Sequence, residues 1–160
     1  MSGEVFNPKD TISAKLGKVF IILDGTRYHW MNVKNIEVKG AIENGEIKRL
    51  GSYLTQFRQT AVAIEGEMTV YWVDSTVQDI VLDLINNGVQ TYFDVQGVCE
   101  DPASNSGKNS YLFTNCVWDG DVPFFKADAD GEFLEQETGF KVNGIQKLEG
   151  FTNTTSIIAG

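Results

Sequence analysis

Between residues 60 and 88 the apolar side chains change from a two-residue repeat to a helical repeat. The polar side chains of 60–72 fall mostly on one parity, and the apolar ones on the other: Val62, Ile64, Met68, Val70 and Trp72. This alternation predicts a β-strand that is buried on one face only. A helical spacing then follows in Val77, Ile80, Val81, Leu84 and Ile85. That stripe predicts an amphipathic α-helix that plugs the core.

Both ends of this helix carry residues that are typical of caps. Ser75, with Gln78 three residues later, predicts a capping box at the N-terminus. Gly88, which follows two asparagines, predicts a left-handed stop at the C-terminus. We therefore expect a short helix between these two caps.

The remaining hydrophobic patterns predict further strands on both sides. Asp24-Gly25 is typical of a hairpin turn, and a phase shift near Lys34-Asn35 predicts a β-bulge. Seven or eight strands with one helix predict a mainly β fold, a β-sandwich or barrel with one flanking α-helix. The predicted strands are 18–23, 27–31, 32–41, 60–72, 89–99, 111–118, 122–129 and 132–142.

The length of 160 residues predicts one domain over 1–160. Polar residues 1–12 predict a loose N-terminal segment, and small residues 152–160 a flexible C-terminal tail. Between 40 and 60 the alternation degrades, and residues 43–46 are typical of a turn. Long irregular stretches in compact domains are usually functional. We therefore expect a long extended arm at 40–60 that becomes ordered against another copy of the chain.

The arm combines apolar side chains with positive charge. Two interpretations stay open: these residues contact another copy, or they form a flap folded onto their own domain. The candidate contact residues are Ile47, Lys48, Arg49, Leu50, Tyr53, Leu54, Phe57 and Arg58.

Charge and cysteine content exclude several classes. A net charge of −9 argues against a protein that holds nucleic acid, because affinity for phosphates depends on Lys and Arg. Cys99 and Cys116 are expected to be free thiols, since residues 1–10 show no secretory signal. No apolar run reaches the length of a membrane-spanning segment.

The sequence offers no catalytic, metal or cofactor site. His29 is the single histidine and fits a partly buried strand residue, and no phosphate loop, nucleophile elbow or dinucleotide motif occurs. Asp128, Asp130, Gly131 and Glu137 partly match a calcium-binding loop, but Lys126 occupies its first ligand position. We interpret that segment as a solvated acidic hairpin and expect no enzyme, no metal and no cofactor.

The order of these elements resembles that of a known family. The stretches that carry the resemblance are 10–20, the turn at Asp24-Gly25, 66–71, 92–96 and the acidic alternation at 133–137. Together they are similar to the tail tube proteins of contractile-tailed bacteriophages, in particular the PBSX-type prophage branch. The similarity extends over residues 11–151.

This resemblance implies a structural subunit of the virion tail, assembled in the bacterial host cytoplasm. Hexameric rings stack into a hollow tube that conducts DNA or other cargo, without specific DNA binding. Its partners are other copies of itself and the sheath, baseplate and tape-measure proteins. The arm at 40–60 corresponds to the segment that contacts the next ring.

The polar face of the strand at 60–72 fits this picture. Glu65, Glu67 and Thr69 are expected to face the lumen, where acidic groups keep the DNA backbone from adhering. The competing interpretation is an ordinary solvent-exposed sheet face.

Two other functions remain as alternatives. A tube-like baseplate or hub protein of a bacteriocin or injection system reuses the same fold. A lipocalin-like β-barrel belongs to a different class and predicts a soluble monomer that binds an apolar ligand. The apolar and basic arm counts against that barrel.

Overall fold

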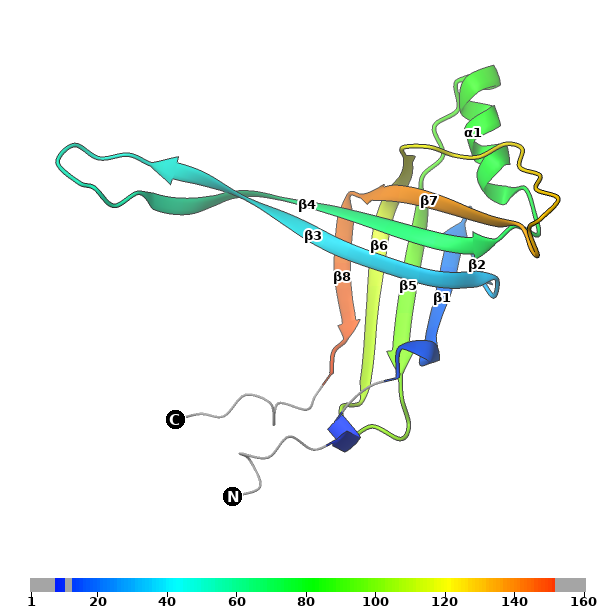
Figure 1. Ribbon diagram of the computed structural model, residues 1–160, viewed down its shortest axis with the longest axis horizontal. Helices are drawn as coiled ribbons and strands as arrows, with labels where there is room; N and C mark the ends of the chain where they lie inside the picture. Colours follow the sequence, from blue (N-terminus) through cyan, green and yellow to red (C-terminus); the bar gives the residue numbers. More distant parts are fainter. Residues whose placement is uncertain (1–7, 11–12, 152–160) are drawn as a thin grey trace. The chain divides into compact units, whose positions relative to one another are not determined.

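The computed structural model describes residues 8–10 and 13–151, which contain eight strands and one α-helix. This confirms the predicted mainly β fold with a single helix (Figure 1). In chain order the elements are η2 (Pro8–Asp10), η3 (Ala14–Leu16), β1 (Gly17–Leu23), β2 (Thr26–His29), β3 (Val33–Ile47), β4 (Gln56–Tyr71), α1 (Thr76–Asn87), β5 (Phe93–Glu100), β6 (Lys108–Asp119), β7 (Glu135–Val142) and β8 (Gly144–Glu149).

The chain folds into two compact units. The first unit contains β1, β2, β5, β8 and β6 up to Cys116. The second unit contains β3, β4, α1, β7 and the last residues of β6, from Val117 onward. All strand pairings in both units are antiparallel.

The first unit is a sheet in the order β2–β1–β5–β6–β8. Asp24 and Gly25 both have positive φ, 50° and 79°, which is the backbone of a tight two-residue hairpin turn. The predicted turn between β1 and β2 is therefore confirmed. The buried apolar side chains of this unit are Val19, Ile21, Trp30, Phe93, Val95, Phe113 and Cys116.

In the second unit, β4 pairs with β3 along its whole length but with β7 along only half of it. The β3 register runs from Val33–Val70 to Ile47–Gln56, with the predicted bulge between Val33 and Asn35. The β7 pairing covers only residues 64–71 of β4. The arm, predicted at 40–60, therefore covers residues 41–63 in the structure and is a two-stranded ribbon closed by a loop at 48–55 (Figure 1).

The predicted turn at 43–46 is wrong. Asn44, Gly45 and Glu46 belong to β3 and lie opposite Gln59, Arg58 and Phe57. The register shifts between Glu43 and Asn44, so the turn-like residues form an irregularity in the strand pairing and the strand continues through them. Turn-forming residue types do not end a strand when a partner strand continues the hydrogen bonds beside them.

The predicted C-terminal stop of α1 is confirmed, and the predicted capping box is wrong. Gly88 has φ 66°, and its N–H donates to the carbonyl of Leu84. At the other end, the Ser75 side chain makes no capping bond. Gln78 instead points inward, where its amide donates to the Gln136 side chain (2.7 Å) and to the Pro123 carbonyl (2.8 Å).

The prediction that α1 plugs the core is also wrong. Of the helix residues only Val77 and Gln78 are buried, and Ile85 remains 64% exposed. The first turn is held by the Gln78 bonds, Ile80 and Val81 are half-buried, and Leu84 and Ile85 at the end of the stripe are exposed. Helical periodicity indicates which side chains share a face, and it does not supply the surface against which that face packs.

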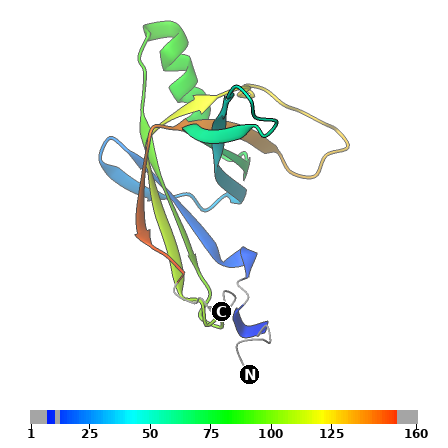
Figure 2. The same ribbon diagram turned by 90° about the vertical axis from the view of Figure 1, so that its left-hand side faces the viewer.

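Two further differences concern the C-terminal third. Residues 122–129 were predicted as a strand. They belong instead to an irregular connection between β6 and β7, which is a long loop in Figure 2. The predicted strands end at 142, whereas β8 follows β7 after the single residue Asn143 and pairs with β6. Most β8 side chains are exposed, so its sequence lacks the alternation that identifies half-buried strands.

We predict that Gly66→Ala destabilises the second unit. A methyl group at Gly66 in β4 would fall within 3.0 Å of atoms of the Phe140 ring, which is buried across the β4–β7 ladder. Overpacking of this kind costs about 1–3 kcal/mol of the free energy of unfolding, measured by urea denaturation.

The matched control is Gly97→Ala in β5, where no described atom lies within 4 Å of the added methyl. That change is expected to be neutral or to stabilise by up to about 1 kcal/mol. Equal losses for both variants would contradict the role of the Phe140 contact.

Candidate functional site

The arm carries its large apolar side chains in contact with solvent. The five predicted apolar residues of the arm are all exposed: Ile47, Leu50, Tyr53, Leu54 and Phe57. The three predicted cations, Lys48, Arg49 and Arg58, are exposed as well. A group of exposed apolar side chains on a projecting ribbon is typical of a protein–protein contact surface.

The ribbon and its loop have defined local structure. In the loop, the Ser52 hydroxyl accepts from the Leu54 N–H at 3.3 Å and donates to the Leu54 carbonyl at 3.2 Å. Gly51 has φ 78°, a conformation that glycine adopts without steric cost. In the ribbon, the Thr60 hydroxyl donates to the Glu43 carbonyl at 3.2 Å. The arm is therefore an extension of the sheet and not the flap that the sequence left as an alternative.

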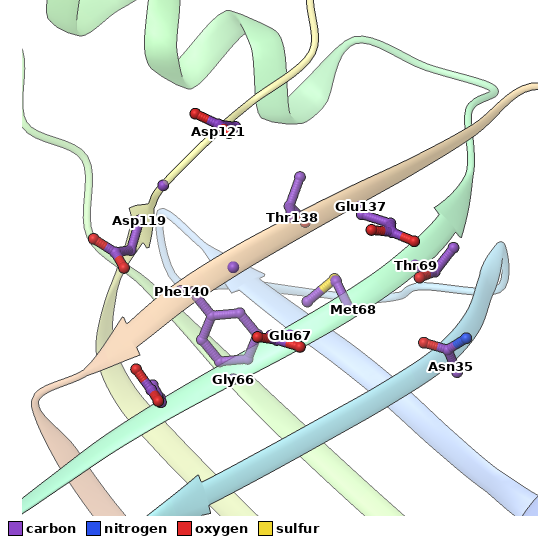
Figure 3. Close-up of a pocket in the computed structure, with 13 residues that line it drawn as sticks. Asn35, Gly66, Glu67, Met68, Thr69, Asp119, Asp121, Glu137, Thr138 and Phe140 are labelled. Atoms are coloured by element: carbon purple, nitrogen blue, oxygen red, sulfur yellow. The ribbon is translucent and has the colours of Figure 1, made fainter. Parts of the chain in front are cut away.

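A second candidate surface is an acidic hollow of about 640 Å³ in the second unit (Figure 3). It is lined by β4, β7, the end of β6 with the turn that follows it, and Asn35 of β3. Its carboxylates come from β4, from β7 and from the end of β6 with its turn: Glu65, Glu67, Glu137, Asp119 and Asp121. A surface with this charge repels phosphate groups.

One lysine partly neutralises the hollow. Lys141 of β7 donates to Glu65 at 2.7 Å and lies 3.8 Å from Asp119. The bond to Lys141 lowers the pKa of Glu65 below its ordinary value of 4.5 and raises the pKa of Lys141 above 10.5. Both side chains reach solvent, so this pair fixes local geometry more than it stabilises the fold.

The structure brings the predicted residues Glu65, Glu67 and Thr69 together on one face of β4, where they line the hollow. It adds Asp119, Asp121 and Glu137, which sequence reasoning missed as members of this surface. The Asp119-Gly120-Asp121 segment carries only a turn signal in the sequence. Its position beside β4 depends on the pairing of β6 with β7.

The other candidate chemical groups lie apart from one another. Cys99 and Cys116 are both free thiols, as expected, and burial raises the pKa of Cys116 to about 12. His29 is exposed, against the expectation of partial burial, and its ring lies 5.0 Å from that of Phe20. Across residues 8–10 and 13–151, no group of three His, Cys, Asp or Glu side chains has metal-binding geometry.

The α1 helix is too short to cross a membrane, and no other helix in the described part of the chain meets the length and hydropathy that a membrane span requires.

Comparison with known proteins identifies relatives over nearly the whole chain. A model of the family described as phage tail tube protein matches residues 4–149. Two proteins of Bacillus subtilis (strain 168) are similar over 146 residues, 91% of this chain and 96% of each relative. They are the phage-like element PBSX protein XkdM, at 27% identity, and the uncharacterized protein YqbM, at 29%. The family match confirms the resemblance that the sequence motifs indicate.

Solved structures share the fold. The baseplate of the anti-feeding prophage has a TM-score of 0.62 at 10% identity, over 90% of this chain and 97% of that chain. The sheath–tube complex of PVC, an extracellular contractile injection system, has a TM-score of 0.61 at 11% identity, over 86% and 93%. The SPP1 tail tube has a TM-score of 0.56 at 13% identity, over 93% and 87%.

We predict that Lys141→Met moves the pKa of Glu65 back toward its ordinary value. Because the Lys141 bond depresses this pKa, the pair stabilises the fold above pH about 4.5 and loses that contribution as pH falls through the lowered pKa. NMR titration of the Glu65 carboxyl carbon measures the change.

The matched control is Lys39→Met, because Lys39 is the weakest of the influences on the Glu65 pKa. It should move that pKa less than Lys141→Met does. An unchanged Glu65 titration in Lys141→Met would contradict the assignment of the ion pair.

Proposed function

The chain belongs to the phage tail tube protein family, and on that premise we propose that its copies form hexameric rings that stack into a tail tube. The observation that carries this proposal is the arm, a two-stranded ribbon whose apolar side chains are left uncovered by the described parts of its own subunit. In the proposed assembly, a neighbouring subunit covers the apolar side chains of the arm.

Unpaired sheet edges support ring formation. Among the described residues, β2 and β8 of the first unit and β3 of the second unit each pair on one side only. An open edge is a template for another strand unless something covers it, and closed cyclic symmetry covers the edges of every copy. We propose six copies because the baseplate structure that shares this fold is described as six-fold symmetrised.

We assign the arm to the contact between successive rings. The proposed contact residues are Ile47, Lys48, Arg49, Leu50, Tyr53, Leu54, Phe57 and Arg58. Their exposure supports this role, because burying apolar area on association yields about 25 cal/mol per Å² before the costs of binding are subtracted.

The acidic hollow is proposed to face the lumen, with Glu65, Glu67 and Thr69 on its wall. A wall of carboxylates lets DNA or other cargo pass without adhering, since phosphate binding depends on cations. We further propose a contractile tail whose sheath, baseplate and tape-measure proteins contact this tube, built in the host cytoplasm. The likeness to the PVC sheath–tube complex supports this. In this role the chain carries no enzymatic activity.

We predict that shortening the arm abolishes stacking. Removing residues 42–62 and joining Ala41 to Ala63 through Asn-Gly keeps the observed Ala41–Ala63 register. Negative-stain electron microscopy should show tubes for the wild type and only rings or monomers for the variant. Circular dichroism checks that the variant folds.

A milder pair of variants separates the loss of contacts from the loss of the ribbon. Leu50→Ser with Tyr53→Ser removes two exposed apolar side chains, whereas Gln56→Ser changes an exposed polar residue of the same arm. Tubes should be lost in the first and kept in the second. Long tubes in the shortened variant would exclude this role for the arm, and rings that never stack in the wild type would indicate a baseplate-like protein.

We also predict where the carboxylates of the hollow lie in the assembled tube. A cryo-electron microscopy map of wild-type tubes should place Glu65 and Glu67 on the inner wall. Their appearance on the outer wall would exclude the lumenal role and leave tube formation unaffected.

A further inference from the structure

The end of the second unit that lies opposite the arm presents an uncovered apolar surface of its own. It consists of α1 and the connection at 122–134, which we call the acidic end. Phe125 is 88% and Phe133 79% exposed. Its exposed apolar side chains include Leu82, Leu84, Ile85, Phe124, Phe125 and Phe133.

Hydrogen bonds hold the two parts of the acidic end together. Gln78, in the first turn of α1, donates to the Pro123 carbonyl at 2.8 Å, near the start of the connection. The Trp72 N–H, just before α1, donates to the Leu134 carbonyl at 2.9 Å, at the end of the connection. Helix and connection are therefore anchored to the same end of β4 and β7.

The tip of the arm, residues 47–58, and the acidic end carry opposite charge, while Glu43 and Glu46 lie nearer the base of the arm. The arm segment from Ile47 to Arg58 contains three cations and no carboxylate. The acidic end contains one lysine, Lys126, and five carboxylates: Asp79, Asp83, Asp128, Asp130 and Glu132. Each surface therefore combines exposed apolar side chains with the charge that the other one lacks.

One subunit cannot bring its own two surfaces together. The arm is at the N-terminal end of β4, and α1 follows its C-terminal end (Figure 1). The sixteen residues of β4 hold these ends roughly 50 Å apart, at about 3.3 Å per residue. Contact between them requires two copies, arranged head to tail. A head-to-tail contact that does not close produces an open stack.

We propose that the arm of one copy docks on the acidic end of a second copy. Leu50, Tyr53 and Phe57 pack on the exposed apolar side chains of α1 and of the connection. Lys48 and Arg49 lie beside the carboxylates there. The inference rests on the proposed function, because it specifies the partner surface of the contact between rings.

The acidic hollow is the competing partner for the arm, and it offers charge without apolar surface. Its apolar lining residues Met68 and Phe140 are each only 1% exposed. The apolar side chains of the arm would therefore stay in contact with solvent there. The acidic end accommodates both the charge and the apolar side chains.

Photocrosslinking in assembled tubes tests the docking directly. p-Benzoylphenylalanine at position 53 of unlabelled chains is mixed with ¹⁵N-labelled wild-type chains before assembly, so that mixed-isotope peptide pairs are intermolecular. We expect those pairs to join the arm to 76–87 or 122–134. The same probe at Ile85 should give the reciprocal pairs to 47–58. Met31 is exposed and lies outside both surfaces. The probe at Met31 should therefore give crosslinks to neither the arm nor the acidic end.

Charge reversal provides a second test. Lys48→Glu with Arg49→Glu should abolish tubes, and so should Asp83→Lys with Glu132→Lys. Combining all four changes in one chain should restore tubes, because the arm is then acidic and faces a basic partner surface. Lys15→Glu with Lys18→Glu reverses exposed charges outside both surfaces and should leave tubes intact. Circular dichroism establishes that each variant is folded.

The outcomes separate the two levels of the proposal. Wild-type tubes whose arm crosslinks lie elsewhere, or folded single reversals that still form tubes, would overturn this docking and leave the tube function standing. Failure of the wild-type chain to form rings or tubes would overturn the proposed function and this inference with it.

Discussion

The difference in length between β4 and its partner β7 is the constraint on which the second unit depends. β7 pairs with residues 64–71, so among the described strands the rest of β4 has β3 as its only partner. A two-stranded ribbon has no second layer against which to bury side chains, and isolated ribbons are marginal in water. The apolar residues of the arm therefore remain exposed until another molecule covers them.

The end of the second unit that carries α1 also has exposed apolar side chains. The buried pair Gln78–Gln136 and the bond from Gln78 to Pro123 fix the first turn of α1. Beyond that turn the helix projects with Leu84 and Ile85 exposed. One subunit thus carries uncovered apolar surface at both ends of β4, and this arrangement suits repeated head-to-tail assembly better than a monomer. In a monomer both surfaces would be liabilities for aggregation.

The exposed surfaces of the second unit differ in charge as well as in apolar content. The tip of the arm at 47–58 is basic, its proposed partner surface is acidic, and the hollow over β4 and β7 is acidic with a buried apolar lining. Lys141 ties Glu65 to β7 within that hollow, while Glu67 stays exposed on the same strand. Complementary charge of this kind directs which surfaces meet and contributes less to the strength of the contact.

The sequence by itself determined the elements whose signals are local. Alternation identified β4, and Asp24-Gly25 identified the first hairpin. The phase shift near Lys34-Asn35 indicated the bulge, and Gly88 indicated the end of α1. The family resemblance and the apolar, basic content of the arm were readable in the same way. These features depend on residue type and on period, which the chain carries wherever it folds.

Only the tertiary structure decided what covers each face. The stripe on α1 predicted burial, yet Leu84 and Ile85 at its end are exposed, and residues 43–46 continue a strand because β4 lies beside them. The exposed strand β8 gave no periodic signal, and the pattern at 122–129 predicted a strand where the structure has an irregular connection. The carboxylates of the hollow come from three separate segments and meet only through the pairing of β6, β7 and β4. A repeat pattern specifies which side chains share a face, and strand partners distant in sequence determine whether that face is buried.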